Sequence, residues 1–232
     1  LKALLLSKHK VTCVLTQPDR QKGRGLHFAA TAVKTIALET GIKIYQPCNV
    51  NDSETVKFLK NLNTDLFVVI AYGQILSQEI LDIPKIFSIN VHASLLPKYR
   101  GAAPINWAII KGDKTTGITI IKMAKEMDAG PIILQKEIEI SNDDTAITLQ
   151  DKLADLAAQL LLATLSSIED NNFKLIPQNQ DGVTFAPKLK KEDGRINWSK
   201  PAQEIYNLIR GCTSWPGAFT YYNGKLLKIY KA

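Results

Sequence analysis

Cysteine and histidine are both scarce in this sequence of 232 residues, which contains three of each. The cysteines are Cys13, Cys48 and Cys212, too far apart for a Cys-x-x-Cys pair, and no cysteine–histidine spacing fits a zinc ligand set. Disulfide-rich frameworks and structural zinc domains need closely spaced ligands or partners. The sequence therefore predicts reduced thiols and no bound metal.

Long apolar runs are missing as well. A transmembrane helix needs about 20 consecutive apolar residues, and no stretch approaches that length. The opening LKALLL is too short for the apolar region of a signal peptide, and no small-residue cleavage site follows it. Since 45% of the residues are hydrophobic and 22% are charged, the chain can bury a core. We expect a folded cytoplasmic protein without a membrane anchor.

Three common motifs of nucleotide-binding proteins and hydrolases are also absent. The sequence contains no GxxxxGK[ST], no GxGxxG and no GxSxG. These motifs build the phosphate-binding loop, the dinucleotide-binding turn and the nucleophile elbow of hydrolases. Their absence leaves all three functions unsupported.

The positive charge is concentrated at the C-terminal end. The net charge is +7, and residues 186–232 hold nine Lys or Arg against three Asp or Glu. A near-neutral body with a basic end favours a small-molecule domain joined to a segment that binds a polyanion. A lysine-rich surface that only aids solubility is the alternative.

In the first two thirds, apolar runs typical of strands alternate with helical patterns. Helices are predicted at 31–40, 52–62 and 104–112, with a long one from 143–144 onward; strands are predicted at 11–16, 42–45, 66–71, 86–91, 117–123 and 131–140. This alternation predicts an open α/β sheet of mostly parallel strands. The wholly apolar run 66–71 is expected to be buried on both faces, and residues 18–25 are expected to form a polar loop.

After residue 171 the pattern changes. A charged stretch at 188–194 precedes a predicted helix at 201–210 and two short strands joined by Asn223-Gly224, a strong hairpin signal. We therefore predict a catalytic domain at 1–172, a linker at 173–193 and the beginning of a small β-rich domain at 194–232.

One histidine differs from the other two by its position in a strand. His92 follows Asn90 by two residues in the sequence SINVH, so a strand places both side chains on one face. Ligands bind at the carboxyl ends of strands in open α/β sheets. Taken alone, a hydrogen-bonded core histidine is the commoner case.

A carboxylate completes the candidate site. Asp128 lies in the turn MDAGP between two predicted strands, where aspartate commonly bonds its own backbone. Near His92 it would instead orient the imidazole or relay a proton. Asn90, His92 and Asp128 together supply the donors and the base that attack of an amine on a carbonyl needs. Arg100 alone is more typical of a surface or capping residue.

These residues resemble the folate-dependent formyltransferase family. Five sequence segments show the resemblance: NVHASLLPKYRG from Asn90, DAG from Asp128, TQPDRQKGRG from Thr16, VVIAYG from Val68 and WPGAFT from Trp215. The similarity extends over the whole chain, and the QPDR…GRG segment and basic tail are similar to the branch that acts on tRNA.

The resemblance implies a Rossmann-like formyltransferase domain followed by a partial OB-like β-barrel domain that binds tRNA. The implied reaction moves a formyl group from 10-formyltetrahydrofolate to the α-amino group of methionine on initiator tRNA, for translation initiation. The enzyme is expected to act as a monomer and to need no metal ion.

The resemblance also assigns roles to individual residues. Asn90 and His92 would polarise the formyl oxygen and stabilise the tetrahedral oxyanion, while Asp128 would hold His92 and help to move the proton of the attacking amine. Folate contacts are expected from Ser94, Leu95, Leu96 and Pro97 and from Ala71, Tyr72 and Gly73; tRNA contacts are expected from Arg20, Lys22 and Arg24.

Two departures and two alternatives follow from the same comparison. The family's first strand and its Gly-Thr-Pro loop are expected before Leu1, and the sequence ends inside the β-rich domain, so we expect incomplete activity from this stretch alone. A formyltransferase for a sugar-nucleotide or ribonucleotide amine would share Asn90, His92 and Asp128. A non-catalytic RNA-binding module would have no use for that set.

Overall fold

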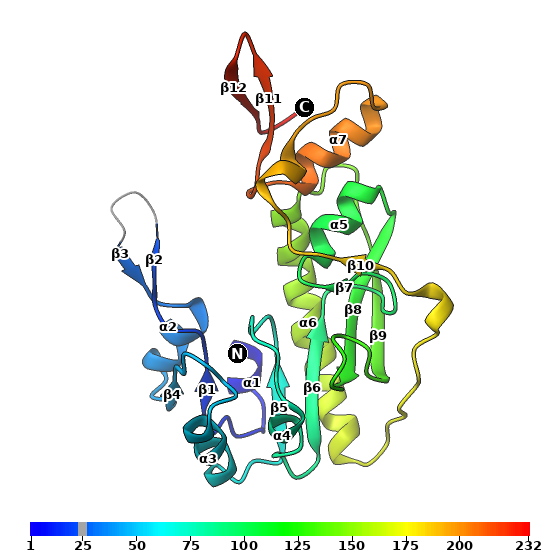
Figure 1. Cartoon of the computed structure of the whole chain (residues 1–232). Helices are drawn as coiled ribbons and strands as arrows, with labels where there is room; N and C mark the ends of the chain where they lie inside the picture. Colours follow the sequence, from blue (N-terminus) through cyan, green and yellow to red (C-terminus); the bar gives the residue numbers. More distant parts are fainter. Residues whose placement is uncertain (23–26) are drawn as a thin grey trace. The chain divides into compact units, whose positions relative to one another are not determined.

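The computed structural model of the chain describes residues 1–22 and 27–232, without the side chains of Lys22 and His27 (Figure 1). The chain divides into two compact units. Unit 1 comprises residues 1–90 and 122–126, and unit 2 comprises residues 91–121 and 127–232.

Short strands and helices alternate through unit 1. Its elements are α1 (Lys2–Leu5), β1 (Val14–Leu15), β2 (Arg20–Lys22), β3 (His27–Ala29), α2 (Ala32–Glu39), β4 (Ile44–Tyr45), α3 (Ser53–Asn61), β5 (Leu66–Val69), α4 (Gln78–Leu81) and the first four residues of β6 (Phe87–His92). Strand β1 pairs with β4, and β5 pairs with β6, both in parallel. These parallel pairs confirm the predicted α/β class.

Side-chain caps begin α2, α3 and α4 of unit 1, and an apolar cluster packs at α3 and α4. Thr31 accepts a hydrogen bond from the backbone of Lys34 at the start of α2, and Asp52 does the same from Thr55 at the start of α3. Such caps satisfy amide groups that lack a partner in the first helical turn. The buried apolar cluster consists of Val50, Val56, Leu59, Leu76, Ile80 and Leu81.

Two predictions for unit 1 were wrong. Residues 20–22 of the predicted loop form β2, which pairs antiparallel with β3 so that Arg20 lies opposite Ala29, and residues 23–25 lie outside the described residues. Strands of three residues each are too short to show a clear alternating pattern in the sequence. The run 66–71 forms a strand only to Val69, and its side chains are half-buried, since β6 is the single neighbour of β5 among the described strands of the unit.

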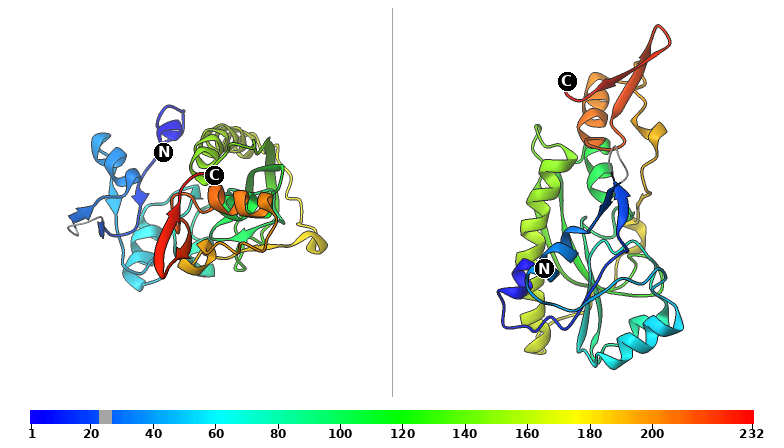
Figure 2. Two further views of the ribbon diagram at one scale, coloured as in Figure 1. Left: turned by 90° about the horizontal axis from the view of Figure 1, so that it is seen from above. Right: turned by 90° about the vertical axis from the view of Figure 1, so that its left-hand side faces the viewer.

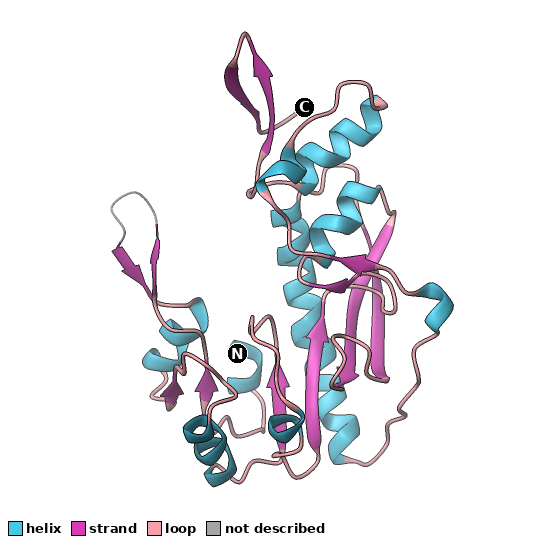
Figure 3. Cartoon of the chain, in the orientation of Figure 1, coloured by secondary structure: helices cyan, strands magenta, loops and turns pink. Residues whose placement is uncertain are grey.

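Unit 2 contains a long helix beside an antiparallel pair of strands (Figures 1 and 3). Its elements after β6 are β7 (Arg100–Gly101), α5 (Pro104–Lys111), β8 (Thr115–Lys122, to Ile121 within this unit), β9 (Ile132–Glu139), α6 (Ala146–Glu169), the short helix Gln180–Gly182, β10 (Phe185–Ala186), the short helix Lys191–Gly194, α7 (Ala202–Gly211), β11 (Ala218–Tyr222) and β12 (Lys225–Ile229). The predicted strands at 117–123 and 131–140 correspond to β8 and β9, which pair antiparallel. The predicted long helix corresponds to α6, which buries Leu149, Leu153, Leu156 and Leu160 at a spacing of three to four residues.

Helix α7 packs against α5, and the chain then forms one hairpin (Figure 2). Contact is close at Gly211, where a Cβ atom would lie 2.6 Å from Cγ1 of Ile110. Strands β11 and β12 pair antiparallel through Asn223 and Gly224, both at positive φ, as the hairpin signal predicted. The described residues show this hairpin but no closed OB-like barrel.

Candidate active site

Strand β6 positions both polar residues that the sequence singled out. Ile89 and Val91 are 0% and 7% exposed, and the alternation of side chains along a strand places Asn90 and His92 on the opposite face. Asn90 is half-buried and His92 is 5% exposed. The strand therefore carries a nearly enclosed imidazole at its carboxyl end.

Both nitrogens of the His92 ring face acceptors. Nε2 lies 2.9 Å from the backbone oxygen of Tyr99, and Nδ1 lies 3.6 Å from Oδ2 of Asp128. A carbonyl oxygen only accepts, so Nε2 carries a hydrogen and donates it to Tyr99. Nδ1 faces the Asp128 carboxylate at 3.6 Å, which exceeds a direct hydrogen bond, and it is the ring nitrogen that does not donate to the backbone.

Asp128 is held in the turn between β8 and β9 by a backbone donor. Its φ is +52°, an uncommon conformation for a residue with a side chain, and its Oδ2 accepts a hydrogen bond of 2.9 Å from the N–H of Gly101. The side chain is 11% exposed. The structure thus brings together His92 and Asp128, as the sequence suggested.

Arg100 and Gln178 form a buried polar network behind this turn. Each is 7% exposed. Oε1 of Gln178 accepts from Nε and Nη2 of Arg100 at 3.1 and 2.7 Å, and its Nε2 donates to the carbonyls of Asp128 and Gly130 at 2.7 and 2.8 Å. Arg100 is therefore not the surface residue that its local sequence suggested. Sequence reasoning missed Gln178 altogether, because its partners lie 48 to 78 positions away.

The loop after His92 is fixed by a buried hydroxyl. Oγ1 of Thr119 donates to the carbonyl of Ser94 at 2.6 Å and accepts from the N–H of Leu96 at 3.1 Å. Gln135 donates to both the Thr119 hydroxyl and the Leu96 carbonyl, at 2.7 and 3.0 Å. The predicted folate loop, residues 94–97, is therefore anchored to β8 and β9.

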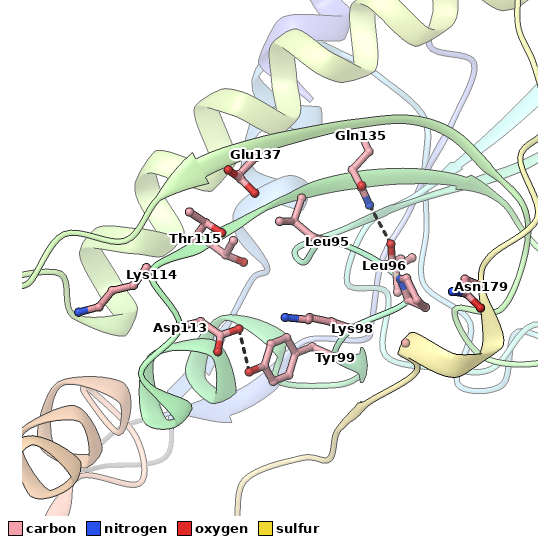
Figure 4. A pocket seen from close by; sticks show the side chains of 13 residues that line it. Leu95, Leu96, Lys98, Tyr99, Asp113, Lys114, Thr115, Gln135, Glu137 and Asn179 are labelled. Atoms are coloured by element: carbon pink, nitrogen blue, oxygen red, sulfur yellow. Dashed lines mark hydrogen bonds between the residues drawn. The ribbon is translucent and has the colours of Figure 1, made fainter.

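A cavity of about 460 Å³ lies beside this loop (Figure 4). Its lining includes Leu95, Leu96 and Pro97 but not His92 or Asp128. Lys98 extends between Tyr99 and Leu95, and the Tyr99 hydroxyl donates to Asp113 at 3.0 Å. Burial and the neighbouring Asp113 carboxylate raise the pKa of Tyr99. The ring of Tyr99 thus lines the cavity while its backbone oxygen accepts from His92.

In unit 1, the turn after β5 carries the other predicted folate contacts. Ala71 and Gly73 have φ values of +47° and +85°, so the chain turns sharply around Tyr72. The Tyr72 carbonyl accepts from Nε2 of Gln17 at 3.1 Å. Its hydroxyl has no hydrogen-bond partner among the described residues, and burial raises its pKa.

The same unit holds the predicted tRNA contacts. Arg20 is exposed on β2 and donates to Oε1 of Gln17 at 3.2 Å, so the hairpin base and the Tyr72 turn share Gln17. Asp19 pairs with Lys34 at 2.6 Å and accepts from Gln46. The side chain of Lys22 and all of Arg24 lie outside the described residues.

The described part of the chain shows neither a metal-binding cluster nor a membrane-spanning helix. No group of three or more His, Cys, Asp or Glu there is arranged to hold a metal ion. None of its helices combines the length and apolarity that a membrane crossing requires.

Comparison with known proteins identifies the family. Residues 1–165 match the family described as formyl transferase, and residues 188–232 match the family described as formyl transferase, C-terminal domain. The chain belongs to the formyl transferase family. The methionyl-tRNA formyltransferase of Caldanaerobacter subterraneus subsp. tengcongensis is 52% identical, over 100% of this chain and 75% of the relative. That of Acetivibrio thermocellus is 50% identical, over 99% of this chain and 74% of the relative.

Solved structures of formyltransferases share the fold. The N-formyltransferase of Helicobacter canadensis, in complex with folinic acid and dTDP-3-aminofucose, matches with a TM-score of 0.74 at 22% identity, over 99% of this chain and 81% of that one. HypX of Aquifex aeolicus, in complex with tetrahydrofolic acid, matches with a TM-score of 0.68 at 21% identity, over 84% and 34%. These likenesses confirm the Rossmann-like formyltransferase fold.

Proposed function

We propose that this formyl transferase moves a formyl group from 10-formyltetrahydrofolate to the α-amino group of methionine on initiator tRNA. Two relatives with methionyl-tRNA formyltransferase activity are 50% and 52% identical over essentially the whole chain. The observation that carries the chemistry is the enclosed His92–Asp128 pair, with Nδ1 and Oδ2 at 3.6 Å. The sugar-nucleotide acceptors of structural neighbours at 22% identity are not favoured over tRNA.

His92 acts through Nδ1, because Nε2 is committed to the Tyr99 carbonyl. A proton on Nδ1 stabilises the charge that develops on the reacting carbonyl oxygen, as a preorganised donor does in other acyl transfers. Asn90, on the same face of β6, supplies a neutral amide donor to that oxygen. Asp128 orients the imidazole, takes up the proton that the attacking amine loses and passes it to the folate nitrogen. The bond between that nitrogen and the formyl carbon then breaks, which leaves formylmethionyl-tRNA and tetrahydrofolate.

The proposed folate contacts are residues 94–97 and 71–73. In unit 1, the turn exposes Ile70 and Ile75 and buries an unpartnered Tyr72 hydroxyl, features that suit a flat ring with apolar faces and polar edges. In unit 2, Thr119 and Gln135 fix the backbone of residues 94–97. 10-Formyltetrahydrofolate supplies the activated formyl group, so these residues need only bind and orient it.

The proposed tRNA contacts combine the β2–β3 hairpin with the basic C-terminal end. Arg20 is exposed, and Lys22 and Arg24 follow it in the sequence. Exposed Trp198, Tyr222 and Tyr230 are interspersed with lysines in residues 186–232, a combination suited to nucleic acid. We assign β11–β12 as the first hairpin of an OB-like tRNA-binding domain, with domains at 1–172 and 194–232 and a linker at 173–193.

Two further properties belong to this proposal. The protein acts in the cytoplasm, where aminoacylated initiator tRNA is made and used. We also propose that it acts as a monomer; the His92–Asp128 pair lies within one chain and needs no residue from a second copy.

The substitution His92→Ala tests the function. We expect it to abolish formylation of methionyl initiator tRNA while binding of tetrahydrofolate, measured by calorimetry, largely survives. His9→Ala, a histidine outside the candidate site, is the matched control and should keep both. Equal loss of formylation and folate binding would make His92 a structural residue. A natural protein that formylates an amino sugar nucleotide but not tRNA would contradict the assignment.

A further inference from the structure

Gln178 is a buried amide whose whole hydrogen-bonding capacity is used. Its oxygen accepts two bonds from the Arg100 guanidinium, and its nitrogen donates one bond to each of two carbonyls, those of Asp128 and Gly130. Rotating the amide by 180° would place its N–H groups against a guanidinium and its oxygen against two carbonyls. The network therefore fixes one orientation of the amide.

The two carbonyls that Gln178 holds belong to the turn of Asp128. That turn keeps Asp128 at a φ of +52°, a conformation that costs free energy and persists only where its surroundings hold it. Arg100 reaches the same aspartate by a second route, because the N–H of its neighbour Gly101 donates to Oδ2 of Asp128 at 2.9 Å. The backbone of Asp128 is thus held by Gln178, which is bonded to Arg100, and its carboxylate is held by Gly101, the residue next to Arg100.

The other partner of His92 is held by the same stretch of chain. Thr184 accepts from the N–H of Tyr99 at 2.8 Å through its hydroxyl and from the N–H of Arg100 at 2.9 Å through its carbonyl. The Tyr99 carbonyl in turn accepts from Nε2 of His92. Residues 178–184, part of the predicted linker, therefore contact the backbone of both residues that face the imidazole, Tyr99 and Asp128.

We infer that Gln178 is a positioning residue for formyl transfer, which it supports by holding the Asp128 carboxylate at Nδ1 of His92. This inference rests on the proposed function. Glutamine suits the position because one amide both accepts from a buried cation and donates to two carbonyls. A glutamate would keep the first contact and set a carboxylate oxygen against the Asp128 and Gly130 carbonyls.

The test compares Gln178→Leu and Gln178→Glu with Gln180→Leu. Gln180 is an exposed glutamine two residues later, and its amide donates to the backbone carbonyl of Gln178 at 3.3 Å. Among the described residues this amide has no bond to Arg100, Asp128 or Gly130, so the variant controls for the loss of a glutamine side chain in the same segment. We expect both Gln178 variants of the natural full-length protein to lose about a hundredfold in kcat, as a misplacement of about 1 Å does. The KM for 10-formyltetrahydrofolate should change less than about twofold, since uniform binding is not affected. Gln180→Leu should match the wild type.

A double-mutant cycle separates positioning from general structural damage. In an Asp128→Asn background, Gln178→Leu should cause little further loss of kcat, because the group that it positions is already gone. If the two losses multiply instead, Gln178 does not act through Asp128 and the inference is wrong. The inference is also wrong if Gln178→Leu keeps the wild-type kcat.

A spectroscopic readout is independent of activity. The Gly101 amide proton donates to a carboxylate, so its NMR resonance should lie downfield and exchange slowly with solvent. Gln178→Leu should move this resonance upfield and speed its exchange, while Gln180→Leu should leave it unchanged. An unmoved Gly101 resonance in Gln178→Leu would overturn the inference even if the protein formylated no tRNA. A wild type that is inactive on tRNA, with the resonance shifted in Gln178→Leu, would instead count against the proposed function.

Discussion

The hydroxyl of Thr119 holds the loop at residues 94–97, and replacing it tests that anchoring. Thr119 is 0% exposed, donates to the Ser94 carbonyl and accepts from the Leu96 N–H. Thr119→Val keeps the shape of the side chain and removes the hydroxyl. Ser94 and Leu96 are themselves 0% and 3% exposed, so water does not easily replace the lost partner.

The expected loss of stability follows from the Ser94 carbonyl and the Leu96 N–H, which would both lose their hydrogen-bond partner. A buried polar group left without a partner costs about 1–3 kcal/mol, so the loss of two partners should lower the free energy of unfolding by about 2–6 kcal/mol. That is a large part of the roughly 5–15 kcal/mol that stabilises a typical domain. Because the freed loop is the proposed folate contact, the KM for 10-formyltetrahydrofolate should rise too.

The same strand offers a matched control. Thr116 is 2% exposed, and its hydroxyl has no partner among the described residues, so Thr116→Val removes an unsatisfied group and should be neutral or stabilising. Urea unfolding of both variants, with unchanged m-values, measures the difference. If the two variants unfold within about 1 kcal/mol of each other, the Thr119 hydroxyl does not anchor the loop.

Three further predictions concern stability and tRNA binding. Leu149→Ala, at a fully buried position of α6, should lower the free energy of unfolding by about 2–5 kcal/mol. Ile147→Ala is the control, because Ile147 is 45% exposed on the same helix, and it should cost less than about 1 kcal/mol. Equal losses of stability in urea unfolding would contradict the packing of α6. Burial of Asp144 tends to raise its pKa, but hydrogen bonds from Lys152, the Ser141 backbone and Thr148 outweigh it and hold the pKa below its usual value. A carboxyl group whose pKa is lowered in the folded state stabilises the fold at pH values above its unfolded pKa of about 3.9. The loss of unfolding free energy caused by Asp144→Asn should therefore be full at neutral pH and shrink below about pH 4. A loss that does not change with pH would exclude the charge of this carboxylate as its cause. Arg20→Ala should weaken tRNA binding and reduce the salt dependence of the affinity by about one unit in slope, whereas Lys57→Ala on α3 should not; equal slopes in a filter-binding titration would place Arg20 away from the tRNA.

Local signals in the sequence predicted most secondary structure correctly. Helix α5 begins with Pro104 at its first position and ends at Gly112 in the left-handed conformation, the two residues that marked its ends. Asn223 and Gly224 likewise marked the turn between β11 and β12. In each case the residues that determine the conformation lie within a few positions of one another, so a single sequence is enough.

The candidate site was predictable only in part, for the same physical reason. His92 was found because a polar residue in a buried strand is unusual locally. Asp128 is an ordinary turn residue by its local sequence, and its link to His92 came from the resemblance to the formyltransferase motifs. The network behind them depends on Gln178, whose partners are distant in sequence and whose own segment has no periodic pattern. The pairing of β2 with β3 was missed because each strand has three residues, too few to show a clear alternating pattern.

The account depends most on Asp128 acting at His92 in formyl transfer to initiator tRNA. The most direct measurement incubates the natural full-length protein and its Asp128→Asn variant with 10-formyltetrahydrofolate and methionyl initiator tRNA, and quantifies formylmethionyl-tRNA. The account predicts formylation by the wild type and a loss of about 10²–10⁴-fold in the variant, with folate binding retained. Wild-type formylation that survives Asp128→Asn, or a folded wild type that makes no formylmethionyl-tRNA, would contradict it.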